Sequence, residues 1–206
     1  MSKGQVPGAE ASGAIGLVVA PVQPSSTAPD WSREAKPFWA WDPGRSLLAS
    51  IRAYERGGAI GRRIAVLRHR FWSVVTGADI PLRSRIAGGL LIPHPNGIVI
   101  HPGAVIGPNC LIFQQVTLGT AGSTRVAPVL GGHVDVGAGA KVLGAIRVGA
   151  NARIGANAVV LSDVAEGSTV VGIPARPVQG RSSGKAETAG VRASATQSAR
   201  AQATRT

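Results

Sequence analysis

The chain has 206 residues, enough for one domain with flanking segments, and only 4% of them are aromatic while 28 are glycine. A single cysteine, Cys110, excludes an intrachain disulfide framework. The formal net charge of +12 raises the question of a nucleic-acid partner, which depends on where the charge lies.

The basic residues are concentrated in one region. Residues 43–85 carry nine arginines against Glu55 and Asp79, whereas residues 86–178 have a net charge of only +2. No aromatic residues alternate with these arginines to form a surface that reads bases. We therefore expect a solvated helix face and no nucleic-acid partner, although the field would still attract anionic cofactors or partners.

The first segment, residues 1–29, is rich in Gly, Ala, Pro, Ser and Val and predicts a disordered N-terminal arm. Its apolar run, residues 14–20, is too short to span a bilayer and makes a poor signal peptide. We therefore expect a cytoplasmic protein without a membrane partner.

Residues 30–78 predict a helical segment. Three tryptophans and Phe38 in residues 31–41 indicate a hydrophobic anchor, with a base-stacking platform as the alternative. Asp42 followed by Pro43 is typical of a helix start, and Gly57-Gly58 would end that helix. A second helix is expected over about residues 60–75, with an apolar face made by Ile64, Leu67, Phe71, Val74 and Val75.

Residues 79–178 carry a six-residue repeat. Aliphatic residues recur without a miss at Leu130, Val136, Val142, Val148, Ile154 and Val160, and shorter runs in the same period start at Ile80 and Ile100. The position four after each is small or β-branched, as a narrow interior requires. This period predicts a parallel β-helix with three short strands per coil of about 18 residues.

Two irregularities interrupt the period. Two extra residues appear between Ile92 and Ile100, beside His94, and residues 119–125 are polar and predict a loop that leaves the coil. Loops on a rigid scaffold are frequent sites of function. Cys110 falls at an interior position, which favours a small buried residue over a catalytic thiol. Residues 179–206 predict a disordered basic tail.

The repeat resembles the hexapeptide-repeat acyltransferases, specifically their serine O-acetyltransferase branch. The resemblance rests on His94 with the following Gly97-Ile98-Val99, and on four further motifs: residues 115–120, 136–144, 154–161 and 171–176. It implies a mainly β fold, a left-handed parallel β-helix preceded by a short helical segment. It also implies a homotrimer or a dimer of trimers, with acetyl-CoA between two subunits.

The resemblance also implies the catalytic pair. In that family a histidine is the general base on the acceptor hydroxyl, and an aspartate fifteen residues earlier orients it. His94 and Asp79 have this spacing, which is close to one coil. The alternatives are a structural role for His94 and a cap or turn role for Asp79.

The acceptor side departs from the family pattern. Pro93 stands where the family has an aspartate, and Val126-Ala127 stand where it has an Arg-His pair. Arg125 is the candidate replacement for that arginine, and Asp42 resembles a family aspartate that contacts serine. The substrate-binding candidates are therefore Asp42 and Arg125. Serine is the first acceptor hypothesis, and a sugar or polysaccharide hydroxyl is the second.

The cofactor side matches the family better. The candidates for binding acetyl-CoA are Gly119, Thr120, Ala138, Gly139, Ala140, Arg153 and Ala156. Arg153 has the alternative of a solvent-facing turn residue. The spacing of His94, His101 and His133 forms no metal motif, so no metal is expected. The C-terminal sequence lacks the isoleucine through which the family binds its sulfhydrylase partner, which makes that partner doubtful. A catalytically inert β-helix scaffold is the hypothesis of a different class.

Overall fold

The computed structural model describes residues 25–122 and 125–178, so most of the predicted arm (residues 1–29) and the whole predicted tail (residues 179–206) lie outside the described residues. A short 3-10 helix, η1 (Trp31–Glu34), precedes two α-helices, α1 (Pro43–Arg56) and α2 (Ala59–Thr76). Thirteen short strands follow. No helix among the described residues has the length and apolar character needed to cross a membrane.

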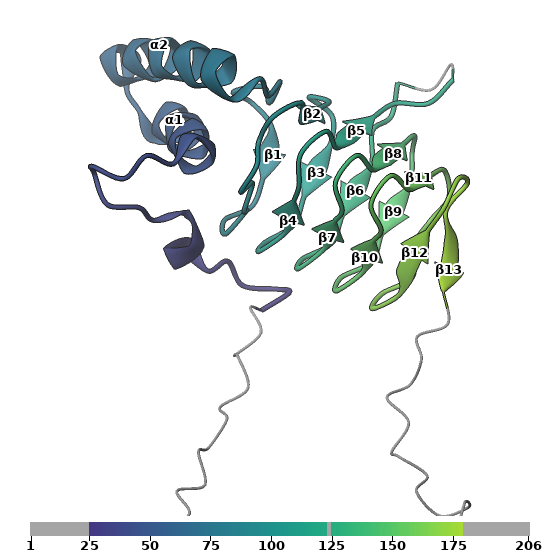
Figure 1. The fold of residues 1–206 in the computed structure, drawn as a ribbon. Coiled ribbons are helices and arrows are strands. Elements are labelled where there is room, and N and C mark those ends of the chain that lie inside the picture. Colours follow the sequence, from purple (N-terminus) through teal and green to yellow (C-terminus); the bar gives the residue numbers. More distant parts are fainter. Residues whose placement is uncertain (1–24, 123–124, 179–206) are drawn as a thin grey trace, which may run out of the picture.

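The strands form three parallel sheets that close into a triangular coil (Figure 1). The sheet we call B contains β1 (Arg85–Ile86), β3 (Val105–Ile106), β6 (Val129–Leu130) and β9 (Arg147–Val148). Sheet C contains β4 (Leu111–Ile112), β7 (Asp135–Val136), β10 (Arg153–Ile154), β12 (Thr169–Val171) and β13 (Arg176–Val178). Sheet A contains β2 (Val99–Ile100), β5 (Thr117–Gly119), β8 (Lys141–Leu143) and β11 (Val159–Val160). The predicted left-handed β-helix is confirmed.

The six-residue period decides which side chains enter the core. Each predicted inward residue from Leu130 to Val160 is at most 3% exposed. The residues four positions later, from Val134 to Val164, are also buried. Stacking one coil on the next places like positions over one another, as Val136 lies between Ile112 and Ile154 in sheet C.

The first coil is longer than the later ones. Asp79 pairs with Val99 and Arg85 with Val105, a spacing of 20 residues. Val99 pairs with Thr117, a spacing of 18 residues. The two extra residues predicted beside His94 account for the difference. The expected loop after Leu118 leaves the coil between β5 and β6 (Figure 1).

Both α-helices begin and end for local reasons. Asp42 caps α1 by accepting a hydrogen bond from the Arg45 backbone N–H at 2.9 Å, and Pro43 opens the helix, as the sequence predicts. Gly77 ends α2 in the left-handed conformation with φ of 63°. Helix α1 contacts the first coil closely, since a Cβ at Gly44 would clash with the carbonyl oxygen of Ile92.

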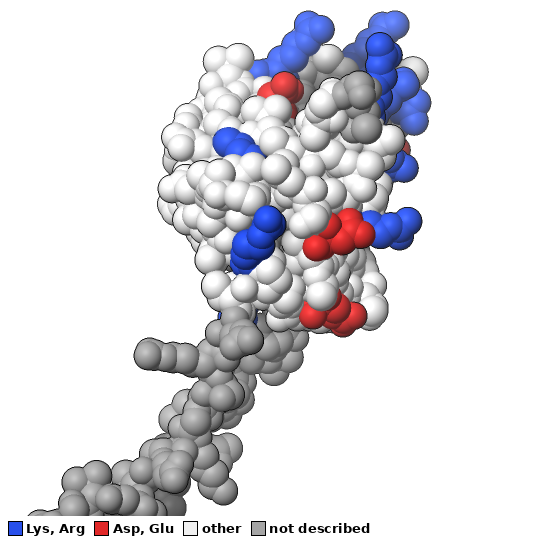
Figure 2. All heavy atoms as spheres, turned by 90° about the vertical axis from the view of Figure 1, so that its right-hand side faces the viewer, with Lys and Arg blue, Asp and Glu red and all other residues white. Residues whose placement is uncertain are grey.

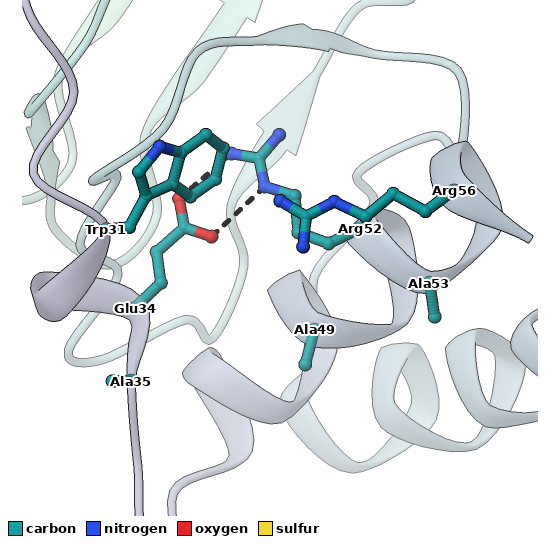
Figure 3. Close-up of a pocket in the computed structure, with 7 residues that line it drawn as sticks. All are labelled: Trp31, Glu34, Ala35, Ala49, Arg52, Ala53 and Arg56. Carbon is teal, nitrogen blue, oxygen red and sulfur yellow. Dashed lines mark hydrogen bonds and ion pairs between the residues drawn. The ribbon is translucent and has the colours of Figure 1, made fainter.

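A buried ion pair ties the helices to the β-helix (Figure 3). Arg52 binds both carboxylate oxygens of Glu34, at 2.9 and 3.0 Å, and donates to the carbonyls of Ile86 and Ala87. The same carboxylate accepts the backbone N–H of Gly89 at 2.8 Å. Burial opposes the charge on Arg52, but Glu34 outweighs it, so the pKa of Arg52 is raised. We call this group the Arg52 cluster.

The aromatic segment meets its expected role as an anchor only in part. The ring of Trp31 lies under the guanidinium groups of Arg52 and Arg56, at 5.2 and 5.3 Å from the ring centroid (Figure 3). Phe38 and Trp39 instead expose 95% and 84% of their surface. The last residues of the predicted arm, 25–29, lie against the coil because the Asn109 side chain donates to the carbonyls of Ser25 and Ala28.

We expect Arg52→Ala to lower the free energy of unfolding by about 3–5 kcal/mol, because Glu34 would remain buried without its partner. Urea unfolding followed by circular dichroism measures this change. Arg153→Ala is the matched control, since Arg153 is 68% exposed and lies 3.8 Å from Asp135. An equal effect of the two substitutions would contradict a keystone role for the Arg52 cluster.

Cys110 provides a second test of the core. Its side chain is fully buried, and burial raises the pKa of the thiol from 9.0 to about 11. The folded state therefore favours the neutral thiol, and this contribution to stability falls as the pH rises from about 9 towards 11. We expect alkylation of Cys110 at pH 8 to be slow in the folded protein and fast in urea, as measured by mass spectrometry. Rapid labelling of the folded protein would contradict a closed interior.

Candidate active site

The turns between sheets C and A stack into a ladder along one edge of the β-helix. Its rungs are the pairs 96–97, 114–115, 138–139 and 156–157. Backbone hydrogen bonds join them, from Gln115 N–H to the Asn96 carbonyl, from Gly139 to Gln114 and from Asn157 to Ala138, at 2.8 to 2.9 Å. The second residue of each rung has a positive φ, between 56° and 74°. We call this edge the corner ladder.

His94 lies just before the first rung of the corner ladder. Its side chain is exposed and has no hydrogen bond within the described residues. Pro93 and Pro95 flank it, and because proline has no N–H, neither neighbour donates a backbone hydrogen bond. The turn closes behind it through the bond from Ile98 N–H to the Pro95 carbonyl at 3.2 Å. The His94 ring is therefore accessible to a substrate.

Asp79 lies on the other side of the first rung. Its backbone N–H donates to the Ile98 carbonyl at 2.8 Å and its carbonyl accepts from Ile100 at 2.9 Å. The residue stacked against it is thus Val99, five positions beyond His94. The Asp79 carboxylate is exposed, and within the described residues no hydrogen bond or ion pair joins it to His94.

A hollow of about 360 Å³ lies beside His94, where the start of α1 meets the first coil. It is mostly apolar and is lined by Trp41, Asp42, Pro43, Arg45, Leu91, Ile92 and Pro93. Asp42 and Pro93, far apart in sequence, therefore share one hollow. The Asp42 carboxylate is already engaged, because it caps α1 and lies 3.3 Å from the Arg45 guanidinium. Arg125, the other acceptor candidate, is exposed in the loop after β5 and is not part of this hollow.

The cofactor candidates are arranged around sheet A. Ala138, Gly139 and Ala156 lie on the corner ladder, on the same edge as His94. Gly119 and Thr120 lie at the opposite edge of the sheet, where the Gly119 carbonyl accepts from Gly144 at 2.9 Å. Ala140 is fully buried, and its backbone bonds to Gly137 and Thr117 within the coil. The Arg153 side chain is exposed on β10.

Gln114 is a polar residue at this edge that the sequence pattern does not single out. Its side-chain oxygen is buried and has no hydrogen-bond partner among the described residues. It occupies the second rung of the corner ladder, between Asn96 and Ala138. The repeat marks inward positions only, so it carries no signal for a turn residue of this kind.

Two larger hollows, of about 500 and 600 Å³, contain none of the candidate residues and lie against α1, α2 and sheet B. Among residues 25–122 and 125–178 no three His, Cys, Asp or Glu side chains are close enough to hold a metal ion. Figure 2 shows the end of the molecule that carries the last coils, where acidic and basic side chains both occur on a largely uncharged surface.

Comparison with known proteins identifies relatives of this β-helix. No protein-family model matches the chain. A serine acetyltransferase of Synechococcus elongatus is 50% identical over 107 residues, which are 51% of this chain and 44% of that protein. The chain spans about half the length of the curated relatives it matches.

Solved structures give the same relationship. Neisseria gonorrhoeae serine acetyltransferase in complex with serine is 39% identical, with a TM-score of 0.59 over 66% of this chain and 57% of that one. The Brucella abortus serine acetyltransferase in complex with coenzyme A is 33% identical, with a TM-score of 0.60 over 67% of this chain and 56% of that one. By its motifs, its coil and these similarities, the chain belongs to the serine O-acetyltransferase branch of the hexapeptide-repeat acyltransferases.

Proposed function

We propose that the protein is an acetyl-CoA-dependent O-acetyltransferase and that its acceptor is L-serine, giving O-acetyl-L-serine for cysteine synthesis. The observation that carries the proposal is the accessible His94 at the end of a ladder of small turn residues. It occurs in a chain that shares 33–39% identity with structures that hold coenzyme A and serine.

The reaction needs one base and no covalent enzyme intermediate. Neutral His94 takes the proton from the acceptor hydroxyl as its oxygen attacks the thioester carbonyl carbon. The tetrahedral adduct collapses, the C–S bond breaks, and the imidazolium returns the proton to the leaving thiolate. Asp79 would orient the imidazole and stabilise its charged form, which requires its carboxylate to turn towards His94 across the first rung. Cys110 is buried as a neutral thiol, which disfavours an acyl-cysteine route.

The corner ladder suits the pantetheine arm of acetyl-CoA. Ala138, Gly139 and Ala156 have little or no side chain, so a ligand can approach the backbone closely. The unpaired side-chain oxygen of Gln114 suits an amide N–H of that arm. Arg153 would contact a phosphate. Gly119, Thr120 and Ala140 remain cofactor candidates, with Ala140 acting through the shape of the edge, since its own backbone groups are bonded within the coil.

The exposed position of His94 also favours an assembled site. One chain supplies the corner ladder and an open hollow, and a neighbouring subunit would cover them. We therefore propose a homotrimer, or a dimer of trimers, with the site between subunits. A cytoplasmic location accords with acetyl-CoA as co-substrate, and the sulfhydrylase partner remains doubtful.

A sugar or polysaccharide hydroxyl is the second candidate acceptor, and the hollow beside His94 favours it. An ammonium group needs a free carboxylate, but Pro93 has none and Asp42 is bound to Arg45. A neutral sugar has no such requirement, and the apolar wall formed by Trp41 and Leu91 suits the face of a sugar ring.

We expect His94→Ala to lower kcat by about 10²–10⁴, the usual contribution of a general base, in an assay of thiol release from acetyl-CoA. His133→Ala is the matched control, because His133 lies on another edge and bonds to Asn151. Asp79→Asn should cause a smaller loss. Full activity of His94→Ala with an acceptor that the wild type uses would exclude His94 as the base.

The acceptor is identified by the same assay with L-serine and a panel of sugars and glycans. The proposal expects thiol release with L-serine and a lower KM for serine in Pro93→Asp, since the new carboxylate would bind the ammonium group. Release with a glycan but not with serine would select the second candidate. Failure to bind acetyl-CoA at all, measured by calorimetry, would support an inert scaffold.

A further inference from the structure

The outer face of α2 is apolar from one end to the other, although it is exposed. Ile60 is 75% exposed, Leu67 67% and Val74 85%. Positions three and four apart lie on the same side of a helix, so these residues form one stripe with the others of similar exposure. We call the stripe the α2 outer face; its members are Ile60, Ile64, Leu67, Phe71, Val74 and Val75.

The opposite face of α2 attaches the helix to the rest of the protein. Ala65 and Thr76 are buried, Trp72 packs against the core, and the His69 ring bonds to the Ile80 carbonyl at 2.8 Å. In Figure 1, α2 is the outer of the two helices, at the end of the molecule opposite the last strands. The exposure of the α2 outer face is therefore fixed by how the helix is docked.

Arginines border this stripe, and no acidic residue does. Arg63 and Arg70 lie along one side of the stripe and Arg68 along the other, as the helical spacing requires. There is no Asp or Glu from Arg56 to Ala78. Within the described residues, none of these three arginines forms an ion pair.

The exposed aromatic segment adds to the same end of the molecule. The Trp41 ring contacts the Trp72 ring of α2, with 5.6 Å between centroids, and Trp41 is still 76% exposed. Phe38 and Trp39 precede it and are almost fully exposed. Tryptophan and phenylalanine are favoured where an apolar phase meets water.

These features fit one kind of occupant. A helix with an apolar face, arginines beside it and adjacent tryptophans is the pattern that lies in the plane of a membrane surface. A second copy of this face would place arginines opposite arginines, whereas a bilayer with anionic headgroups satisfies both the apolar stripe and the charges beside it. We propose that α2 docks the protein on the surface of an anionic membrane, without crossing it. This departs from the expectation of no membrane partner.

The test measures co-sedimentation of the full chain with vesicles of phosphatidylcholine alone and with vesicles containing about one third phosphatidylglycerol. We expect binding to the anionic vesicles, weakened by salt, and little binding to the neutral ones. The double variant Leu67→Gln/Phe71→Gln should bind about tenfold or more weakly, because it loses buried apolar surface. Arg63→Glu/Arg70→Glu should lose most of the preference for anionic vesicles.

Matched controls lie far from α2. Leu161→Gln changes an equally exposed leucine after β11, and Arg147→Glu reverses a charge on β9; both should bind vesicles as the wild type does. Circular dichroism shows that each variant is folded. Absence of wild-type binding to anionic vesicles would overturn the proposal. A change in oligomeric mass of Leu67→Gln/Phe71→Gln by light scattering would also overturn it, because a second copy would then be what covers the face.

Discussion

No coil of this β-helix can bury its inward side chains alone. A coil of three two- or three-residue strands is only one layer thick, so the aliphatic residue at each inward position needs the like residue of the next coil above it. That requirement fixes the register of all three sheets together. The same register stacks the turns, and the edge that carries Ala138, Gly139 and Ala156 is a direct result of packing the interior.

The helices close the open end of this stack. The first coil has no coil before it, and α1 lies there, in contact through Gly44 and held by the Arg52 cluster. The arrangement uses a charge where the rest of the core uses aliphatic contacts. Backbone carbonyls at Ile86 and Ala87 have no earlier strand to pair with, and a guanidinium satisfies two of them at once. The candidate site lies at this junction, where α1, the first coil and the corner ladder meet.

The sequence predicted the scaffold well because a strict period has only one structural solution. It placed the inward residues, the cap at Asp42 and the loop after Leu118 correctly. It was less informative about Asp79 and His94. Their spacing of fifteen is close to a regular coil, but the coil that joins them has 20 residues, and Asp79 faces Val99. The two extra residues that expose His94 are the same ones that shift it out of line with Asp79.

The sequence also predicted the apolar stripe of α2 but not the direction in which it faces. Period alone shows that one side of a helix is apolar, whereas the docking of that helix depends on contacts such as that of His69 with Ile80. Likewise, the shared hollow of Asp42 and Pro93 arises because Gly44 lets two backbones approach. Such features depend on tertiary contacts that no local pattern encodes.

The last strand shows how the stack ends. β13 turns back and runs antiparallel to β12, while the Gly172 carbonyl and the Ala175 N–H bond to Val159 at the outer edge of β11. With α1 over the first coil, the exposed hydrogen-bonding groups at both ends are covered. Repetitive β-structures are prone to add further copies at such edges and grow into fibres. Here the chain supplies its own terminators, so a sequence that is periodic for a hundred residues encodes an object of fixed length.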